Sequence, residues 1–185
     1  MLTERFRVLL LALLLGGCQA PLVSPYDEAI DKGIVEFYDA FVYFMRDVPD
    51  NAGKPEGTYE ANLKRYNFLE TKLDVLILRA SSRSLGTGCK LEAKVYEKVS
   101  KLMDSSLPAD IKPQGDAAGD ANGCNTRLLE LVKQQLGLIR EIHAKTDKCG
   151  TPPVSCLRPA TAATAVKIAS QSINAVAVVE ASKRN

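Results

Sequence analysis

The sequence predicts an all-α fold, an antiparallel bundle of about five helices (four long, one short) that follows an N-terminal signal sequence. Apolar residues recur at three- and four-residue spacings through long segments, and no stretch keeps the two-residue period of a strand. Turn-forming residues separate the periodic segments. We divide the chain into a signal (residues 1–17), a tether (residues 18–24) and a single helical domain (residues 25–185).

The N-terminal segment has the layout of a secretory signal. Two arginines precede an uninterrupted apolar run, Val8–Leu15. This run is far shorter than the about 20 apolar residues that a membrane-spanning helix needs, so we do not expect a permanent transmembrane anchor. The run ends at two glycines, and Cys18 follows them.

Leu15-Gly16-Gly17-Cys18 resembles the lipobox of bacterial lipoproteins, which consists of an aliphatic residue, two small residues and a cysteine. In that family a diacylglycerol is joined to the cysteine sulfur, signal peptidase II cuts before the cysteine, and a fatty acyl chain such as palmitate caps the new amino group. The resemblance therefore implies lipidation of Cys18. With three chains, and about 0.8 kcal/mol for each buried methylene group, the attachment would be effectively permanent.

Gln19 bears on where such a protein would be sorted. In Gram-negative lipoproteins an aspartate at the position after the cysteine retains the protein in the inner membrane. Gln19 stands at that position, so the resemblance implies an outer-membrane protein. We expect it on the periplasmic face, with the cell surface as the alternative.

Charge and motifs exclude several classes of function. The chain carries 24 basic and 22 acidic side chains and shows neither a basic patch nor an acidic tail, so we expect no nucleic acid as a partner. No Walker loop, Rossmann glycine set, nucleophile elbow or His-Glu-x-x-His motif is present in the sequence, and we expect no cofactor.

The first helix is expected to start with Ser24 as N-cap and Pro25 at the first helical position. Its apolar stripe is formed by Tyr26, Ile30, Ile34, Phe37, Phe41, Phe44 and Val48. A loop follows at residues 49–53. The second helix is expected from after Thr58 to about Ser84, with a stripe formed by Tyr59, Leu63, Tyr66, Leu69, Leu73, Ile77 and Ala80.

Three further helices are expected in the second half of the chain. The short one carries Leu91, Val95, Val99 and Leu102, and a long Pro-, Gly- and Asp-rich loop follows it. The next extends from about Leu128 to Lys148. The last is expected over Pro159–Ser182, with one side formed by Ala163, Val166, Ser170, Ile173, Ala177 and Glu180. Because this last helix is rich in small residues, we expect it to pack against the aromatic stripes of the first two.

The cysteines predict two disulfides. Four remain besides Cys18, and an even number in an exported domain is typical of paired cysteines. We favour Cys89–Cys124 with Cys149–Cys156, because these are near neighbours along the chain, while the two other pairings stay open. No Cys-x-x-Cys spacing exists and the sequence holds one histidine, so we expect no metal site.

Three groups of residues could form functional sites, and we interpret each of them as structural. Asp27 and Asp31 lie one turn apart and could serve acid–base or metal chemistry, but acids also favour a helix N-terminus. His143 could act as a general base, and its structural role would be a favourable charge at a helix C-terminus. The apolar segment 173–179 is interpreted as part of a buried bundle helix, because polar residues flank it.

Segments Tyr26–Met45 and Gly57–Ala80 are similar to exported helical proteins that have no assigned activity. We therefore expect a non-enzymatic, membrane-anchored protein that contacts an unknown envelope protein, as an accessory, an inhibitor or an immunity-type binder. The alternative is a periplasmic carrier with a pocket for a small apolar ligand, lined by Phe37, Phe41, Tyr66 and Leu73. A filled core with an exposed apolar patch would favour the binder, and a pocket of about 300 Å³ or more would favour the carrier. A hydrolase is the third interpretation.

Overall fold

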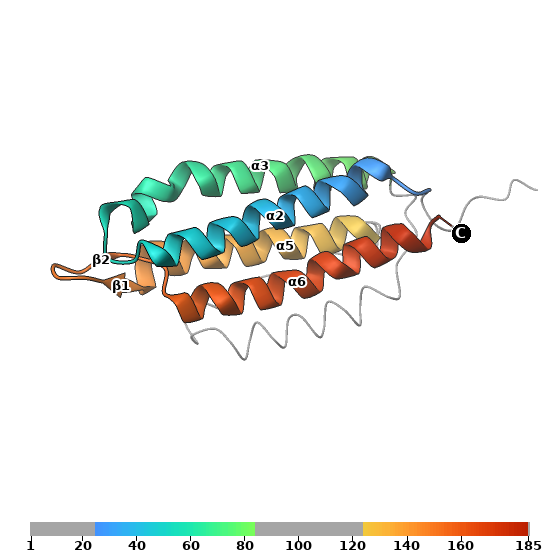
Figure 1. Ribbon diagram of the computed structural model, residues 1–185. Coiled ribbons are helices and arrows are strands. Elements are labelled where there is room, and N and C mark those ends of the chain that lie inside the picture. Colours follow the sequence, from blue (N-terminus) through green and yellow to red (C-terminus); the bar gives the residue numbers. More distant parts are fainter. Residues whose placement is uncertain (1–24, 84–123, 185) are drawn as a thin grey trace, which may run out of the picture.

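The computed structural model describes residues 25–83 and 124–184, which form four long helices lying side by side (Figure 1). They are α2 (Glu28–Asp50), α3 (Tyr59–Arg83), α5 (Cys124–Glu141) and α6 (Pro159–Ser182). The predicted all-α class is confirmed for this part of the chain. The predicted signal, Cys18, the short helix near Leu91 and the Cys89–Cys124 pair lie outside the described residues.

The four helices form a closed ring in sequence order. α2 packs on α3, α3 on α5, α5 on α6, and α6 returns to pack on α2. Neighbours are antiparallel, because the start of α2 meets the ends of both α3 and α6: Asp27 is bonded to Arg79 and to Glu180. The expected contact of the last helix with the first is confirmed, whereas α5 and not α3 is its second neighbour. Residues 142–158 join α5 to α6 at one end of the bundle, and these two helices are adjacent, which leaves α3 across the ring from α6.

α2 begins at Glu28, with Asp27 as its N-cap, and not at the predicted Pro25. The backbone of Asp27 is extended, and its Oδ1 accepts a hydrogen bond from the amide of Ala29 at 2.9 Å. The predicted cap, Ser24, lies outside the described residues. Both residue types cap helices well, so contacts from other helices, described below, decide the start.

The core contains most of the predicted stripes of α2 and α3, but two predicted members are wrong: Tyr26 is only partly buried and lies outside the core, and Leu63 is 36% exposed, with its neighbour Asn62 turned inward. The largest members of the core include Phe37, Phe41, Phe44 and Tyr66, and small residues of α6 pack against the same cluster.

The predicted side of α6 is correct at Ile173 and Glu180, which are buried, and wrong near the start of the helix, where Ala163 is exposed and Ala162 and Ala165 are buried instead. α6 also has the length and apolar composition of a membrane-crossing helix, and here it lies in the bundle with the polar residues Ser172 and Glu180 buried.

The connection between α5 and α6 corrects the expectation that no strand is present. α5 continues into a π-helical turn, η2 (Ile142–Thr146), and a small antiparallel hairpin follows, formed by β1 (Lys148–Cys149) and β2 (Val154–Ser155). Two-residue strands are too short to show an alternating pattern in sequence. The predicted Cys149–Cys156 disulfide is present in this hairpin, with the two Cα atoms 5.8 Å apart. At the same end of the bundle, the 3-10 turn η1 (Pro55–Gly57) leads into α3.

Candidate functional site

Three features of the described residues could carry a function. The first is an ionic cluster at the end of the bundle where α2 begins. The second is a buried histidine at the opposite end. The third is the apolar outer face of α3.

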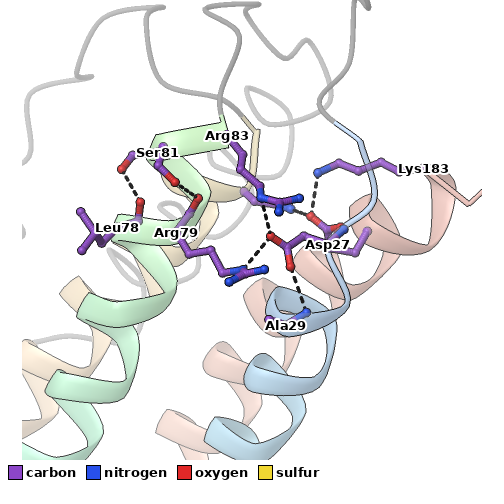
Figure 2. Close-up of polar contacts among 10 residues, drawn as sticks. Asp27, Ala29, Leu78, Arg79, Ser81, Arg83 and Lys183 are labelled. Atoms are coloured by element: carbon purple, nitrogen blue, oxygen red, sulfur yellow. Dashed lines mark hydrogen bonds and ion pairs between the residues drawn. The ribbon is translucent and has the colours of Figure 1, made fainter.

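The ionic cluster is centred on two buried carboxylates, and Figure 2 shows the part around Asp27. Oδ2 of Asp27 accepts a hydrogen bond from Nε of Arg79 at 2.7 Å and lies 3.1 Å from Nε of Arg83. Both cations come from the last turns of α3, whereas Asp27 caps α2. The pair therefore joins the end of one helix to the start of its neighbour.

Glu180, the second carboxylate, lies near the end of α6 and is completely buried. Its Oε2 accepts the backbone amide of Asp27 at 2.9 Å. Its Oε1 accepts Nζ of Lys183 at 2.6 Å and the side-chain amide of Asn125, at the start of α5. All four helices thus meet in one network. Because each carboxylate oxygen of Asp27 and Glu180 already has a donor, the cluster suits fastening better than proton transfer.

The charges around Asp27 set its protonation state. Burial by itself raises the pKa of a carboxyl group. Here the hydrogen bonds from Arg79 and from the amide of Ala29, together with the charges of Arg79 and Arg83, outweigh burial and hold the pKa of Asp27 below its ordinary value. Asp27 is therefore a carboxylate that stabilises the folded protein.

The structure does not bring Asp27 and Asp31 together as a pair. Asp31 turns toward the C-terminal end of the chain, where its Oδ2 accepts the hydroxyl of Tyr26 at 2.9 Å and the guanidinium of Arg184. Among residues 25–83 and 124–184, no three His, Cys, Asp or Glu side chains lie where they could hold a metal ion. The interpretation of these acids as residues at a helix N-terminus is correct, but Asp27 is itself the N-cap and it is buried.

His143 is buried, which corrects the expectation of a charge at a helix C-terminus. Its Nε2 lies 3.0 Å from the carbonyl oxygen of Gly57, and its Nδ1 lies 3.0 Å from the hydroxyl of Tyr66. Because a carbonyl can only accept, the ring proton is on Nε2, and Nδ1 accepts from Tyr66. Burial lowers the pKa of His143, so the neutral ring links η2 to the turn before α3.

The four residues proposed to line a pocket do lie together, but in packed core. Phe37 and Phe41 stack with ring centroids 5.9 Å apart, and Tyr66 packs edge-on against Phe44. Phe37, Phe41, Tyr66 and Leu73 are at most 1% exposed. A cavity wide enough for water would leave accessible surface on its walls, so these side chains line no such space.

The outer face of α3 carries three large apolar side chains that are exposed, and they were not predicted as a site from the sequence. Phe68, Val75 and Leu78 are 54%, 61% and 71% exposed. They lie opposite the buried residues of α3, and Figure 2 shows Leu78 on the side away from Asp27. The signal was a second set of apolar residues, spaced seven and three positions apart, on a helix that already had a core stripe.

The chain was compared with protein families, curated proteins and solved structures, and none of them matches it.

Replacing Asp27 by asparagine removes the ionic pairs while keeping a good helix cap. At neutral pH we expect Asp27→Asn to lower the free energy of unfolding by about 1–2 kcal/mol, since Arg79 and Arg83 lose a charged partner but stay partly hydrated. Because folding holds the pKa of Asp27 below its ordinary 3.8, this stabilisation is fully present above that pH and is lost as the pH falls further.

Urea denaturation of both proteins across this pH range measures the effect. The difference between wild type and Asp27→Asn should narrow as the pH falls below 3.8. Asp39→Asn, an exposed change on the same helix, is the matched control and should leave stability unchanged. A difference that does not vary with pH would contradict the ionic role.

His143 gives a second, separate pH dependence. Its folded pKa lies below its ordinary 6.5, so the unfolded chain binds the extra proton more readily. We expect the free energy of unfolding to be highest above pH 6.5 and to decline as the pH falls through that value. The chain has a single histidine, so His143→Gln should remove the decline between about pH 6.5 and 5. Denaturation at several pH values measures it, and an unchanged slope in the variant would refute this assignment.

Proposed function

We propose that this chain is a non-enzymatic, lipid-anchored protein of the bacterial envelope that acts by contact with another protein. The observation that supports contact is the exposed apolar face of α3, formed by Phe68, Val75 and Leu78. Single exposed apolar residues are ordinary on a protein surface, but a row of them on one helix face is typical of an interaction site. The core around Phe37 and Tyr66 is filled, so a binding site is to be sought on the surface of the bundle.

The location is supported by sequence and covalent structure together. The segment Leu15-Gly16-Gly17-Cys18 resembles a lipobox, and the Cys149–Cys156 disulfide suits an oxidising compartment. A lipid on Cys18, with Gln19 after it, would anchor the chain in the outer membrane, on the periplasmic face. The carrier alternative gains no support, because the side chains proposed to line its pocket belong to the packed core.

The anchor would hold the bundle close to the membrane. Residues 18–24 would span at most about 25 Å, at about 3.5 Å for each residue. The tether leads to Asp27, so the end of the bundle that contains the ionic cluster would be nearest to the membrane. The outer face of α3 would then extend away from the membrane along the bundle.

The anchor is tested with Cys18→Ala in a Gram-negative host. We expect the wild type to be found in the outer-membrane fraction with a fatty-acyl mass on a chain that begins at Cys18, and the variant to lack both properties. Gln19→Asp is the matched control, since it should keep the lipid and move the protein to the inner membrane. Intact-mass analysis and membrane fractionation measure these outcomes. An unmodified wild type, or one that begins elsewhere, would refute the anchor.

Contact through α3 is tested by chemical crosslinking of envelopes that contain the full chain. Phe68→Glu should lose most of the adducts heavier than the monomer, because it places a charge in the apolar row. Val178→Glu, an equally exposed position on α6, should keep them. Circular dichroism checks that both variants fold. The same adducts in both variants would mean that α3 is not the contact surface.

A further inference from the structure

The exposed apolar residues on the outer face of α3 have the spacing that is typical of a helix that pairs with another helix. The residues of this face alternate in steps of three and four, as the a and d positions of a heptad repeat do. Phe68, Val75 and Ser82 occupy the a positions, and Lys64, Thr71 and Leu78 occupy the d positions. A β-branched residue at a and leucine at d favour two strands, and Val75 and Leu78 meet that description.

The polar members of this row are partly satisfied within the helix. The hydroxyl of Thr71 donates to the carbonyl of Asn67 at 2.8 Å, and the hydroxyl of Ser82 donates to the carbonyl of Arg79 at 2.8 Å. If another apolar surface covered these side chains, both hydroxyl donors would keep the acceptors that they have within the helix. Lys64, at the outer end of the row, can keep its ammonium group in water while its stem lies along the interface. The rest of the row can therefore be buried at a low cost.

Charges on the two flanks of the row indicate the occupant. The e positions are all cationic: Arg65, Lys72 and Arg79. The g positions are Glu60, Asn67 and Asp74. Pairs of e and g charges set the partner and the orientation of paired helices. These flanking side chains stay reachable: Arg65, Arg79 and Asp74 are 34%, 42% and 55% exposed even though each has a partner in its own bundle.

The pattern fits a second copy of α3 in parallel orientation. In a parallel pair, a g residue faces the e residue five positions further along the other helix. Glu60 would then face Arg65 of the second copy, and Asp74 would face Arg79 of the second copy. In an antiparallel pair the e positions would face each other and bring cations together, which is unfavourable.

We propose that the outer face of α3 binds a second copy of this chain, in register, with a two-fold axis parallel to the helices. One further argument rests on the proposed function: a parallel pair places both tethers at the same end, so that both lipids can reach one membrane. A lipid surface fits the face less well, because the exposed carboxylates of Glu60 and Asp74 flank the row and would be repelled by anionic headgroups. Confinement to a membrane would raise the effective concentration of so small an interface.

The register is tested by disulfide crosslinking of the full chain in detergent micelles. Equivalent a positions face each other in a parallel pair, so Val75→Cys should give a covalent dimer on mild oxidation. Val178→Cys is the matched control, because Val178 is 60% exposed and lies on α6. It should stay at the monomer mass, apart from any background that the native cysteines also give in the wild type.

A second variant gives a measurement that does not need a new thiol. Leu78→Glu should raise the dissociation constant of the dimer by at least about tenfold, measured by sedimentation, because it buries two carboxylates against each other. Val178→Glu should leave the constant unchanged. Circular dichroism confirms folding of both.

Several outcomes would overturn the proposal. One is a monomer at all concentrations, with no Val75→Cys dimer. Another is a crosslink that forms between positions 68 and 78 in a mixture of the two single-cysteine variants but not between two copies of position 75, which would indicate an antiparallel pair, because a positions face d positions there. A third is a monomer that binds anionic phospholipid vesicles through α3. Loss of the Cys18 lipid in the mass spectrum would refute the anchor and leave the dimer measurable, so the two failures can be told apart.

Discussion

The buried carboxylate of Glu180 is the group on which the arrangement of the four helices depends. Taking a charged carboxylate out of water is costly, and the cost is offset only when hydrogen bonds and opposite charges replace the lost water. Here the donors come from the start of α2, the start of α5 and Lys183 just after α6. Asp27, whose amide is one of these donors, is held in turn by Arg79 at the end of α3. Removing one member would leave the others buried and without a partner, so the network fixes the helices in one register.

From this end, further ion pairs continue along both flanks of α3. On one flank the cations at positions 65, 72 and 79 bond to Asp47, Glu36 and Asp27 of the α2 segment. On the other, Glu70 and Asp74 bond to Arg140 and Lys133 of α5. The core takes a third side of α3, and the fourth is left to Phe68, Val75 and Leu78. The charges that flank the apolar row thus fasten α3 in its own bundle, and because Arg65, Arg79 and Asp74 stay partly exposed they can also meet the charges of the proposed second copy.

The sequence predicted the helices better than it predicted the contacts between them. The bounds of α6 agree with the expectation, because Pro159 and the polar C-terminal residues mark its ends. Its buried side was predicted only in part, since Ala, Ser, Thr and Val give little contrast between faces. The cluster could not be predicted, because Asp27 lies 52 positions from Arg79 and 153 from Glu180. His143 was misplaced for the same reason: Gly57 and Tyr66, far away in sequence, accept and donate its hydrogen bonds.

The proposed anchor at Cys18 and the proposed contact surface on α3 would be joined by a rigid path through the bundle. Asp27 would provide this path, because it lies near the N-terminal end of the described residues and is bonded to α3 through Arg79 and to α6 through Glu180. Arg79 is itself one of the residues that flank the apolar row, one position after Leu78. The tether, the ionic cluster and the outer face of α3 are thus joined through two side chains, with no loop between them. In the proposed parallel pair this would hold the N-terminal ends of both α2 helices at a fixed distance from the two-fold axis, so that both proposed anchors would leave the dimer at the same end.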